Sequence, residues 1–265
     1  MKIAVCIKQV PDTEADIKWD TPKGTLKRDG MNPVTNPFDE FALEEALLTR
    51  EKYDGDIVAI TMGPEKANDA LRNTLALTVN EVHRCTDDAF AGSDTYATAS
   101  VLAAALKKIG GVDVVFCGKQ STDGNTGVVA AEVAAILGWS PLTYVSKVRQ
   151  VDAANKKIVV ERAIEGGVEV IEAKLPAVVS VIKGINEPRL PSLMGIKKAA
   201  KAAIPQWNAD DLGVDKGKVG AAGASTKVVE ISVPPPRGAG EILKGELEDI
   251  ANIVTDKLIY MKVIK

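Results

Sequence analysis

A polar loop between residues 118 and 128 carries the side chains best suited to bind a phosphate group. Lys119 supplies a cation, and Ser121, Thr122 and Thr126 supply hydroxyl groups that can donate hydrogen bonds. The small residues of the loop would let its backbone approach a ligand. The loop contains neither the G-x-G-x-x-G nor the G-x-x-x-x-G-K-[ST] pattern. Its spacing therefore leaves two interpretations open, a nucleotide site and an ordinary turn of an α/β protein.

The segments on either side of this loop predict a strand before it and a helix after it. The apolar run 114–117 is typical of a buried strand, and Gly118 ends it. An Ala- and Val-rich run from Thr126 to Leu137 predicts a helix, with Gly138 just beyond its end. The N-terminus of such a helix exposes unpaired N–H groups and carries a positive partial charge, which favours an anion there.

The first half of the chain alternates between strand and helix signals. Strands are predicted over 3–7, 56–61 and 80–84, and helices over 37–53, 65–77 and 95–109. This order predicts an α/β fold with a doubly wound, mainly parallel Rossmann-like sheet and helices on both faces. Four later runs predict the short strands of an antiparallel extension, over 145–151, 158–163, 168–174 and 177–182.

Ligands of such sheets bind beyond the carboxyl ends of the parallel strands, so segments far apart in the sequence are expected to meet there. Cys6 lies at the end of the first strand, Lys8 follows it, and Met62 follows the second strand. Asn36 is predicted to cap the helix that starts at Pro37. One site built from several loops at this rim is a stronger hypothesis than any single loop.

Composition and charge narrow the function classes. The 265 residues carry a formal net charge of −3 and 4% aromatic residues, which argues against a nucleic-acid surface. No apolar run approaches the ~20 residues that span a bilayer, and the N-terminus does not read as a signal peptide. We therefore expect a cytoplasmic protein without membrane insertion. The three cysteines are far apart and His83 is the sole histidine, so we expect neither a metal site nor a catalytic triad.

A hydrophobic group late in the chain is a candidate partner surface. Leu193, Met194 and Ile196 stand beside several lysines. They form either a docking surface or one face of a helix packed on its own domain.

The chain is expected to divide near residue 205. Residues 1–205 would form the nucleotide-binding domain with its antiparallel extension, and residues 206–265 a linker and a C-terminal arm that packs on a partner. Within the second part, the Gly-, Asp- and Ala-rich residues 208–224 predict a linker, residues 227–233 a strand and residues 240–258 a final helix.

Seven short stretches occur in one order along most of the chain. They are Val5-Cys6-Ile7-Lys8-Gln9-Val10-Pro11-Asp12, Asn36-Pro37-Phe38-Asp39, Met62-Gly63-Pro64, Gly118-Lys119-Gln120-Ser121-Thr122-Asp123-Gly124, Val160-Glu161-Arg162, Lys174-Leu175-Pro176-Ala177-Val178-Val179 and Asn186-Glu187-Pro188-Arg189. Each stretch is weak alone. Together they resemble the β subunit of the electron transfer flavoproteins.

The resemblance implies a heterodimer with an α subunit whose own domain carries an electron-transferring FAD. The β subunit of this family binds AMP or, in bifurcating members, a second FAD. Its partner-recognition loop corresponds to residues 185–204, with Leu193 as the anchor. Carried over by position, and with Lys8 added from the rim, the cofactor site consists of Cys6, Lys8, Asn36, Pro37, Phe38, Asp39, Met62, Gly118, Lys119, Gln120, Ser121, Thr122, Asp123, Gly124, Asn125, Thr126, Gly127, Val128 and Val129.

The start of the chain, the Thr-Met-Gly-Pro turn and residues 89–95 are similar to those of bifurcating members, so FAD is expected rather than AMP. The chain would then help to take a hydride from NADH. One electron would pass to ferredoxin or flavodoxin, and the other through the FAD of the α subunit to an acyl-CoA dehydrogenase-type partner. Arg162 is expected near the flavin as a fixed cation, with Lys8 as a weaker candidate.

Three other functions stay open at this point. A non-bifurcating β subunit would bind AMP structurally and support electron transfer from acyl-CoA dehydrogenases. An ATP-binding signalling module would present a similar sheet and loop. A dehydrogenase with its own NAD site is disfavoured, because the G-x-G-x-x-G pattern and a plausible histidine acid or base are both missing.

Overall fold

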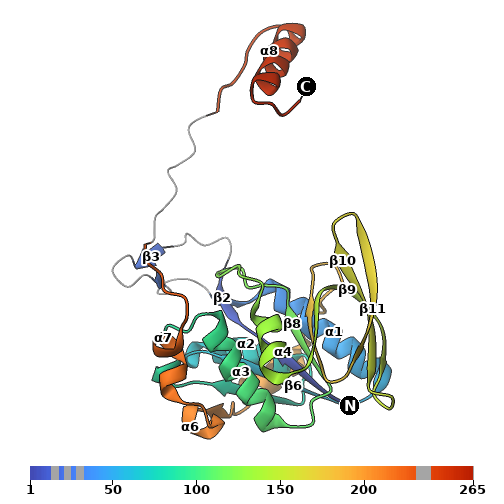
Figure 1. Ribbon diagram of the computed structural model, residues 1–265, viewed down its shortest axis with the longest axis vertical. Coiled ribbons are helices and arrows are strands. Elements are labelled where there is room, and N and C mark those ends of the chain that lie inside the picture. The colour runs from blue at the N-terminus through green and yellow to red at the C-terminus, as the bar shows by residue number, and fades with distance from the viewer. Residues whose placement is uncertain (13–17, 21–24, 28–32, 231–239, 265) are drawn as a thin grey trace. The chain divides into compact units, whose positions relative to one another are not determined.

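The computed structural model describes residues 1–12, 18–20, 25–27, 33–230 and 240–264. They form two compact units, Met1–Val229 and Glu230–Lys265, and each is described by itself. In the first unit, a large and mainly parallel sheet is covered by helices (Figure 1). This confirms the α/β class with an antiparallel portion. Among the helices described, none combines the length and apolar character that crossing a bilayer requires.

The strands of the central sheet are short and mostly apolar. Their bounds are Lys2–Cys6 (β1), Asp56–Met62 (β6), Glu81–Cys85 (β7), Val114–Gly118 (β8), Ser140–Asp152 (β9), Lys157–Ile164 (β10), Gly167–Lys174 (β11), Ala177–Val181 (β12) and Gln206–Trp207 (β13). Across the sheet, the described strands follow the order β11-β10-β9-β12-β8-β1-β6-β7-β13. All neighbours from β9 to β13 in that order are parallel, whereas β10 is antiparallel to both β9 and β11.

Two small antiparallel pairs accompany this sheet. They are β2 (Gln9–Pro11) with β5 (Pro33–Thr35), and β3 (Lys18–Asp20) with β4 (Thr25–Lys27).

Helices cover the two faces of the sheet in two pairs. α1 (Pro37–Tyr53) and α2 (Asn68–Ala76) pack on one face, and α3 (Thr95–Ile109) and α4 (Val129–Leu137) on the other. The shorter helices of the first unit are η2 (Glu65–Ala67), η3 (Asp88–Phe90), α5 (Leu193–Ala200), α6 (Ala209–Leu212), η4 (Lys216–Lys218) and α7 (Gly220–Gly223).

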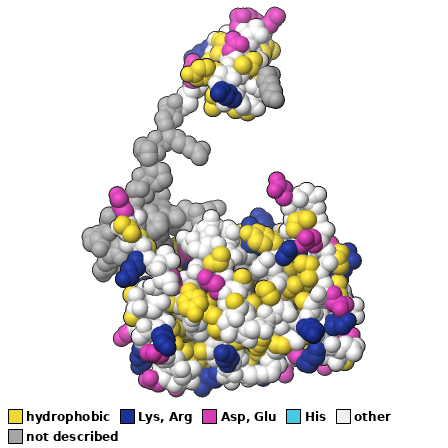
Figure 2. Space-filling model, viewed as in Figure 1, with side chains coloured by type: hydrophobic (Ala, Val, Ile, Leu, Met, Phe, Trp, Pro, Cys, Tyr) yellow, Lys and Arg dark blue, Asp and Glu magenta, His cyan; other side chains and the backbone are white. Residues whose placement is uncertain are grey.

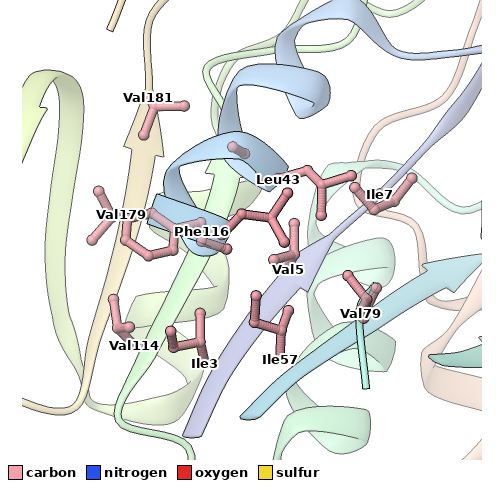
Figure 3. Close-up of a cluster of buried hydrophobic side chains, with 14 of the residues drawn as sticks. Ile3, Val5, Ile7, Leu43, Ile57, Val79, Val114, Phe116, Val179 and Val181 are labelled. Carbon is pink, nitrogen blue, oxygen red and sulfur yellow. The ribbon is translucent and has the colours of Figure 1, made fainter. Parts of the chain in front are cut away.

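The core explains why the central strands are apolar on both faces. Ile3 and Val5 of β1 join the cluster beneath α1 and α2, which includes Phe116 and Leu43 (Figure 3). Ala4, between them, joins the cluster beneath α3 and α4. Successive side chains of a strand point to opposite faces, so a strand covered on both sides must be apolar at every position.

The helix after β8 begins three residues later than the sequence predicts. It starts at Val129 rather than at Thr126. Asn125 and Gly127 both have positive φ, at 56° and 69°. An α-helix cannot include residues in this left-handed conformation. The loop is therefore longer, and the helix N-terminus lies beyond it.

The expected antiparallel extension is smaller than the sequence predicts. β12 was expected among its strands but lies in the parallel part of the sheet, between β8 and β9. All five residues of β12 are buried. Strand order depends on contacts distant in sequence, and an apolar run carries no information about its neighbours.

Residues 208–224, expected as a linker, instead form short helices that pack on the first unit. Ala209 and Val219 are buried in the cluster beneath α3. The carboxylate of Asp94 accepts hydrogen bonds from the N–H groups of Ser225 and Thr226, at 2.8 and 2.9 Å. These helices give the Gly- and Ala-rich segment a fixed place in this unit.

The described residues of the second unit include one helix. The predicted helix over 240–258 is α8, Leu247–Tyr260. Its apolar side chains are exposed within this unit and lie between charged ones (Figure 2). The predicted strand 227–233 falls partly outside the described residues, and 227–230 form no strand. Packing of this arm on a partner stays a prediction.

Candidate functional site

Loops from neighbouring strands meet at the carboxyl edge of the parallel sheet. The rim loop, residues 118–128, follows β8, and its neighbour β1 leads into the segment around Lys8. The side chain of Lys8 lies 2.6 Å from the carboxylate of Asp123 and 3.4 Å from the hydroxyl of Ser121. The side chain of Asp123 is largely buried. The ammonium group of Lys8 therefore forms an ion pair that holds the rim loop. The sequence did not predict this ion pair.

Asn36 ties the rim loop to the start of α1. It occupies the predicted N-cap position, but its side chain makes no capping hydrogen bond. Its amide donates to the carbonyl of Gln120 at 2.9 Å, and its carbonyl oxygen accepts from the N–H of Thr122 at 3.3 Å. Pro37 has no N–H to be capped, and the backbone carbonyl of Asn36 accepts from Asp39. The side chain is thus available to bind the loop.

Asp39 joins three elements through its two carboxylate oxygens. It accepts hydrogen bonds from the N–H groups of Lys8, at 2.8 Å, and Gly118, at 3.1 Å. Burial raises the pKa of its carboxyl to about 7, although both N–H groups and the side chain of Asn36 act to lower it. A Cβ on Gly118 would lie 2.4 Å from an oxygen of Asp39 and 2.6 Å from the carbonyl carbon of Phe38. Only glycine fits at this junction.

Two cysteines lie side by side beneath the rim. The register that pairs Val5 with Phe116 places Cys6 beside Cys117 on the next strand. A hydrogen bond between the two thiols, followed by burial, raises the pKa of Cys6 well above its usual range. A thiol held in its protonated form is a poor nucleophile. Both residues are small side chains in the wall beneath the rim.

The rim loop is also braced from within. The N–H of Asn125 donates to the carbonyl of Ser121 at 2.9 Å, and the N–H of Gly124 lies 3.4 Å from the Ser121 hydroxyl. The amide of Gln120 donates to the side chain of Asn125. Lys119 donates its N–H to Val181 on β12, at 2.9 Å. These bonds fix the loop without using the start of the next helix.

Several donors beside the loop are left for a ligand. The N–H groups of the first turn of a helix have no intrahelical partner. Val128, which precedes α4, supplies no side-chain cap for them. The hydroxyl of Thr122 is buried and has no hydrogen-bond partner among the described residues. An anion with several oxygens would satisfy these groups together. The described residues include no cluster of three or more side chains suited to a metal.

Arg162 lies at the same level of the sheet as the rim loop but not beside it. The register aligns Gly118 with Val181, Val181 with Val145, and Val145 with Arg162. Three strand spacings separate the ends of this row, about 14 Å. Its guanidinium is 2.7 Å from the carboxylate of Glu169 on the neighbouring strand. The structure therefore places Arg162 along the rim from the donors beside the rim loop.

Met62 ends β6, one strand beyond β1. It packs against the apolar cluster that Cys6 also contacts and that includes Cys117. This makes it part of the wall beneath the rim.

The predicted docking residues are exposed at the start of α5. Leu193 and Met194 are 79% and 82% exposed, and Ile196 is 47% exposed. The hydroxyl of Ser192 caps this helix by accepting from the N–H of Gly195 at 3.0 Å. On the other side, Ala199 is buried. The apolar face at the helix start is therefore not part of the described core.

The segment before these residues is fastened to α1, which sequence reasoning missed. Arg189 donates to both oxygens of Glu44, at 3.0 and 2.9 Å from Nε, and binds Glu51. Asn186 donates to the carboxylate of Glu45 at 3.0 Å. Asn186 and Arg189 belong to a stretch that carries the family resemblance. No local pattern in the sequence indicates that they contact α1, which lies over 130 residues earlier. Residues 186–196, named here the docking segment, are thus held in place.

Comparisons with known proteins agree along nearly the whole chain. The pattern of the electron transfer flavoprotein domain matches residues 23–212. The electron transfer flavoprotein subunit beta of Thermoanaerobacterium thermosaccharolyticum is 44% identical over 259 residues, which cover 97% of this chain and 98% of that protein. The protein FixA of Bradyrhizobium diazoefficiens is 40% identical over 259 residues, covering 96% of this chain and 90% of that protein.

A third relative is named as part of a larger complex. The caffeyl-CoA reductase-Etf complex subunit CarD of Acetobacterium woodii is 38% identical over 260 residues, covering 97% of this chain and 98% of that protein. Both the domain match and these identities extend across the rim loop and the docking segment. The chain belongs to the family of electron transfer flavoprotein β subunits and FixA proteins, and its role is in electron transfer.

Proposed function

We propose that this chain binds FAD at the rim loop and acts as the β subunit of a bifurcating electron transfer flavoprotein, paired with an α subunit that carries a second FAD. One observation carries the proposal. Segments after β1 and before α1 are bonded to the rim loop, and donors without a partner remain on the loop and at the start of the helix that follows it. These donors are the first turn of α4 and the hydroxyl of Thr122.

The residues present fit the phosphate end of such a cofactor. The backbone N–H groups of the first turn of α4, which begins at Val129, would hold the pyrophosphate together with the hydroxyl of Thr122, supported by the positive end of the helix. Gly118 keeps the loop close to α1, since a side chain there would push the two apart. Lys8 and Asp123 neutralise one another, so they fix the loop without repelling an anion.

The cofactor, when bound, supplies the redox chemistry by accepting a hydride and passing its electrons on singly. The protein supplies binding, position and charge. Arg162 would present a positive charge along the rim, shared with Glu169. Its distance from the rim loop favours FAD over AMP, because only the longer molecule extends beyond its phosphates in this direction.

The proposed reaction partners follow from the same assignment. NADH would be the hydride donor, and ferredoxin or flavodoxin the low-potential acceptor. An acyl-CoA dehydrogenase-type flavoenzyme would dock at Leu193, Met194 and Ile196. The relative from Acetobacterium woodii, named as a subunit of a caffeyl-CoA reductase-Etf complex, supports an assembly of this kind. A non-bifurcating β subunit with AMP is the alternative.

The test is to purify the heterodimer after expressing the chain with its α subunit, and to identify its nucleotides. The visible spectrum and the extracted nucleotides would be quantified per heterodimer. Two FAD molecules support the proposal. One FAD and one AMP support the alternative, and a heterodimer without flavin would reject both.

A further inference from the structure

β9 contains a one-residue bulge beside the rim loop. Val179 of β12 pairs with Leu142 of β9, and Val181 pairs with Val145. Two steps along β12 therefore match three steps along β9. An extra residue of this kind bends the strand and changes the side to which the next side chains point.

Packing explains the bulge but not the residue in it. Leu142 and Val145 are both buried in the same cluster, although residues three apart in a regular strand face opposite sides. The bulge resolves this by placing Tyr144 at φ +57°. Glycine adopts this conformation without strain, whereas it is unfavourable for a bulky side chain. The ring of Tyr144 remains 44% exposed, so burial in the core does not account for it either.

The ring of Tyr144 lies next to the rim loop. The ammonium of Lys119 is 5.1 Å from the ring centre, a cation–π contact that holds the ring beside the second residue of the loop. The N–H of Tyr144 is 3.4 Å from the hydroxyl of Ser180 on β12. In the other direction, Val145 is aligned with Arg162. In the order of the strands, Tyr144 therefore lies between the rim loop after β8 and the strand β10 that carries Arg162.

We propose that Tyr144 stacks against the isoalloxazine ring of the FAD bound at the rim loop. This inference rests on the proposed function and adds a residue to it. A strained, exposed aromatic residue beside a binding loop is explained when a flat ligand covers it. The ring of Tyr144 lies on the side of the loop that leads to Arg162, where the flavin end of the cofactor would extend.

The experiment uses the heterodimer and three variants, Tyr144→Phe, Tyr144→Leu and Tyr144→Gly. FAD and AMP are titrated separately onto protein freed of the β-subunit nucleotide, and the fluorescence of the bound flavin is recorded. For Tyr144→Leu, we expect FAD affinity to fall about tenfold, AMP affinity to stay the same, and flavin fluorescence to rise. Tyr144→Phe keeps an aromatic ring and should retain most of the FAD affinity.

Tyr144→Gly separates binding from folding. It removes both the ring and the backbone strain, so its melting temperature should equal or exceed that of the unaltered protein, while FAD affinity falls as in Tyr144→Leu. Unchanged FAD affinity in both variants would overturn the inference. An equal loss of FAD and AMP affinity would also overturn it, because it would place the ring against adenine. Loss of the α subunit instead of the flavin would overturn it as well. If the unaltered heterodimer binds no FAD at this site, the proposed function itself fails.

Discussion

The rim loop and the docking segment are both fastened to α1, but by different forces. At the N-terminus of the helix, the amide of Asn36 and the carboxylate of Asp39 bind backbone groups of the rim loop. About two and four turns later, Glu44 and Glu51 bind the guanidinium of Arg189. The first attachment relies on single hydrogen bonds to the backbone. The second relies on several charged bonds to one side chain.

The difference follows from what each segment has to leave free. In the proposed function, the rim loop would keep N–H groups free for an anion, and its attachments use few groups and little net charge. The docking segment would keep apolar side chains exposed for a partner, and a bidentate ion pair fixes a backbone without covering them. We therefore expect a single substitution at an attachment to displace the rim loop. A single substitution in the docking segment should leave part of that segment ordered.

The largest effect is expected for Gly118→Ala. The new methyl group would overlap the carboxylate of Asp39 and the backbone of Phe38, which should cost about 2–3 kcal/mol of unfolding free energy. The nucleotide of the β subunit should be lost. Gly167→Ala is the matched control, because a Cβ at Gly167 meets nothing within 4 Å. Urea unfolding and nucleotide content measure the two effects, and a Gly118→Ala protein with normal values for both would contradict the role given to this glycine.

Arg189→Met should have the next largest effect and should act on the other segment. It leaves the buried carboxylate of Glu44 without its partner, at a cost of about 2 kcal/mol once the partial exposure of Arg189 is taken into account. Electron transfer to the dehydrogenase partner should weaken, with nucleotide content unchanged. Arg149→Met removes the exposed ion pair with Glu161 and should change stability by less than about 0.5 kcal/mol. Loss of nucleotide in Arg189→Met would show that the two attachments are not independent.

Asp39→Asn tests the rim attachment with almost no change in shape. The amide keeps one acceptor but turns a donor toward the second N–H group, which should cost about 1–2 kcal/mol at low pH. Because burial raises the pKa of the carboxyl from 3.8 to about 7, the folded state binds its proton more tightly than the unfolded chain does. This group should make stability fall as pH rises from about 4 to about 7, with no further change above that.

The difference between Asp39→Asn and the unaltered protein should show this pH dependence. The measurement is the unfolding free energy of both proteins at pH 5 and pH 8. Equal differences at the two pH values would mean that the carboxyl does not titrate in this range.

Leu193→Ala should have the smallest effect on stability, because the side chain is 79% exposed. Docking of the dehydrogenase should nevertheless weaken, since an anchor residue contributes mainly in the complex. Leu190→Ala, at a side chain that is 91% exposed, tests whether the effect belongs to Leu193 alone. Reduction kinetics of the bound flavin by the dehydrogenase would measure both variants. Equal kinetics for Leu193→Ala and the unaltered protein would move the docking site elsewhere.

Elements with local signals were the ones that the sequence predicted well. The helix predicted over 95–109 has these bounds in α3, between the cap Asp94 and Gly110, because caps and hydrophobic periodicity are properties of a few neighbouring residues. β12 was assigned to the wrong group of strands, since its position is decided by β8 and β9. Residues 208–224 were predicted to be a linker because they are rich in small residues. Small residues also allow close packing, as the contact of Gly220 and Ala221 with residues 89–91 shows.

The candidate site divides in the same way. The alternation of strands and helices brought Lys8, Asn36 and the rim loop to one edge, as predicted. The pairing of Lys8 with Asp123 and the bulge at Tyr144 depend on side chains and strand register that no local pattern records. The match to electron transfer flavoproteins favours an electron-transfer role over a signalling module.

Asn36 has a practical consequence for anyone engineering this protein. Serine is an equally good residue for a helix start but is too short to reach Gln120, so Asn36→Ser could cap the helix but would release the loop. The cap gained at α1 would offset part of the stability lost with the two bonds to the loop, so the melting temperature should change less than the nucleotide content. Melting temperature is therefore a misleading guide at this position, and selection here needs a direct measure of bound cofactor.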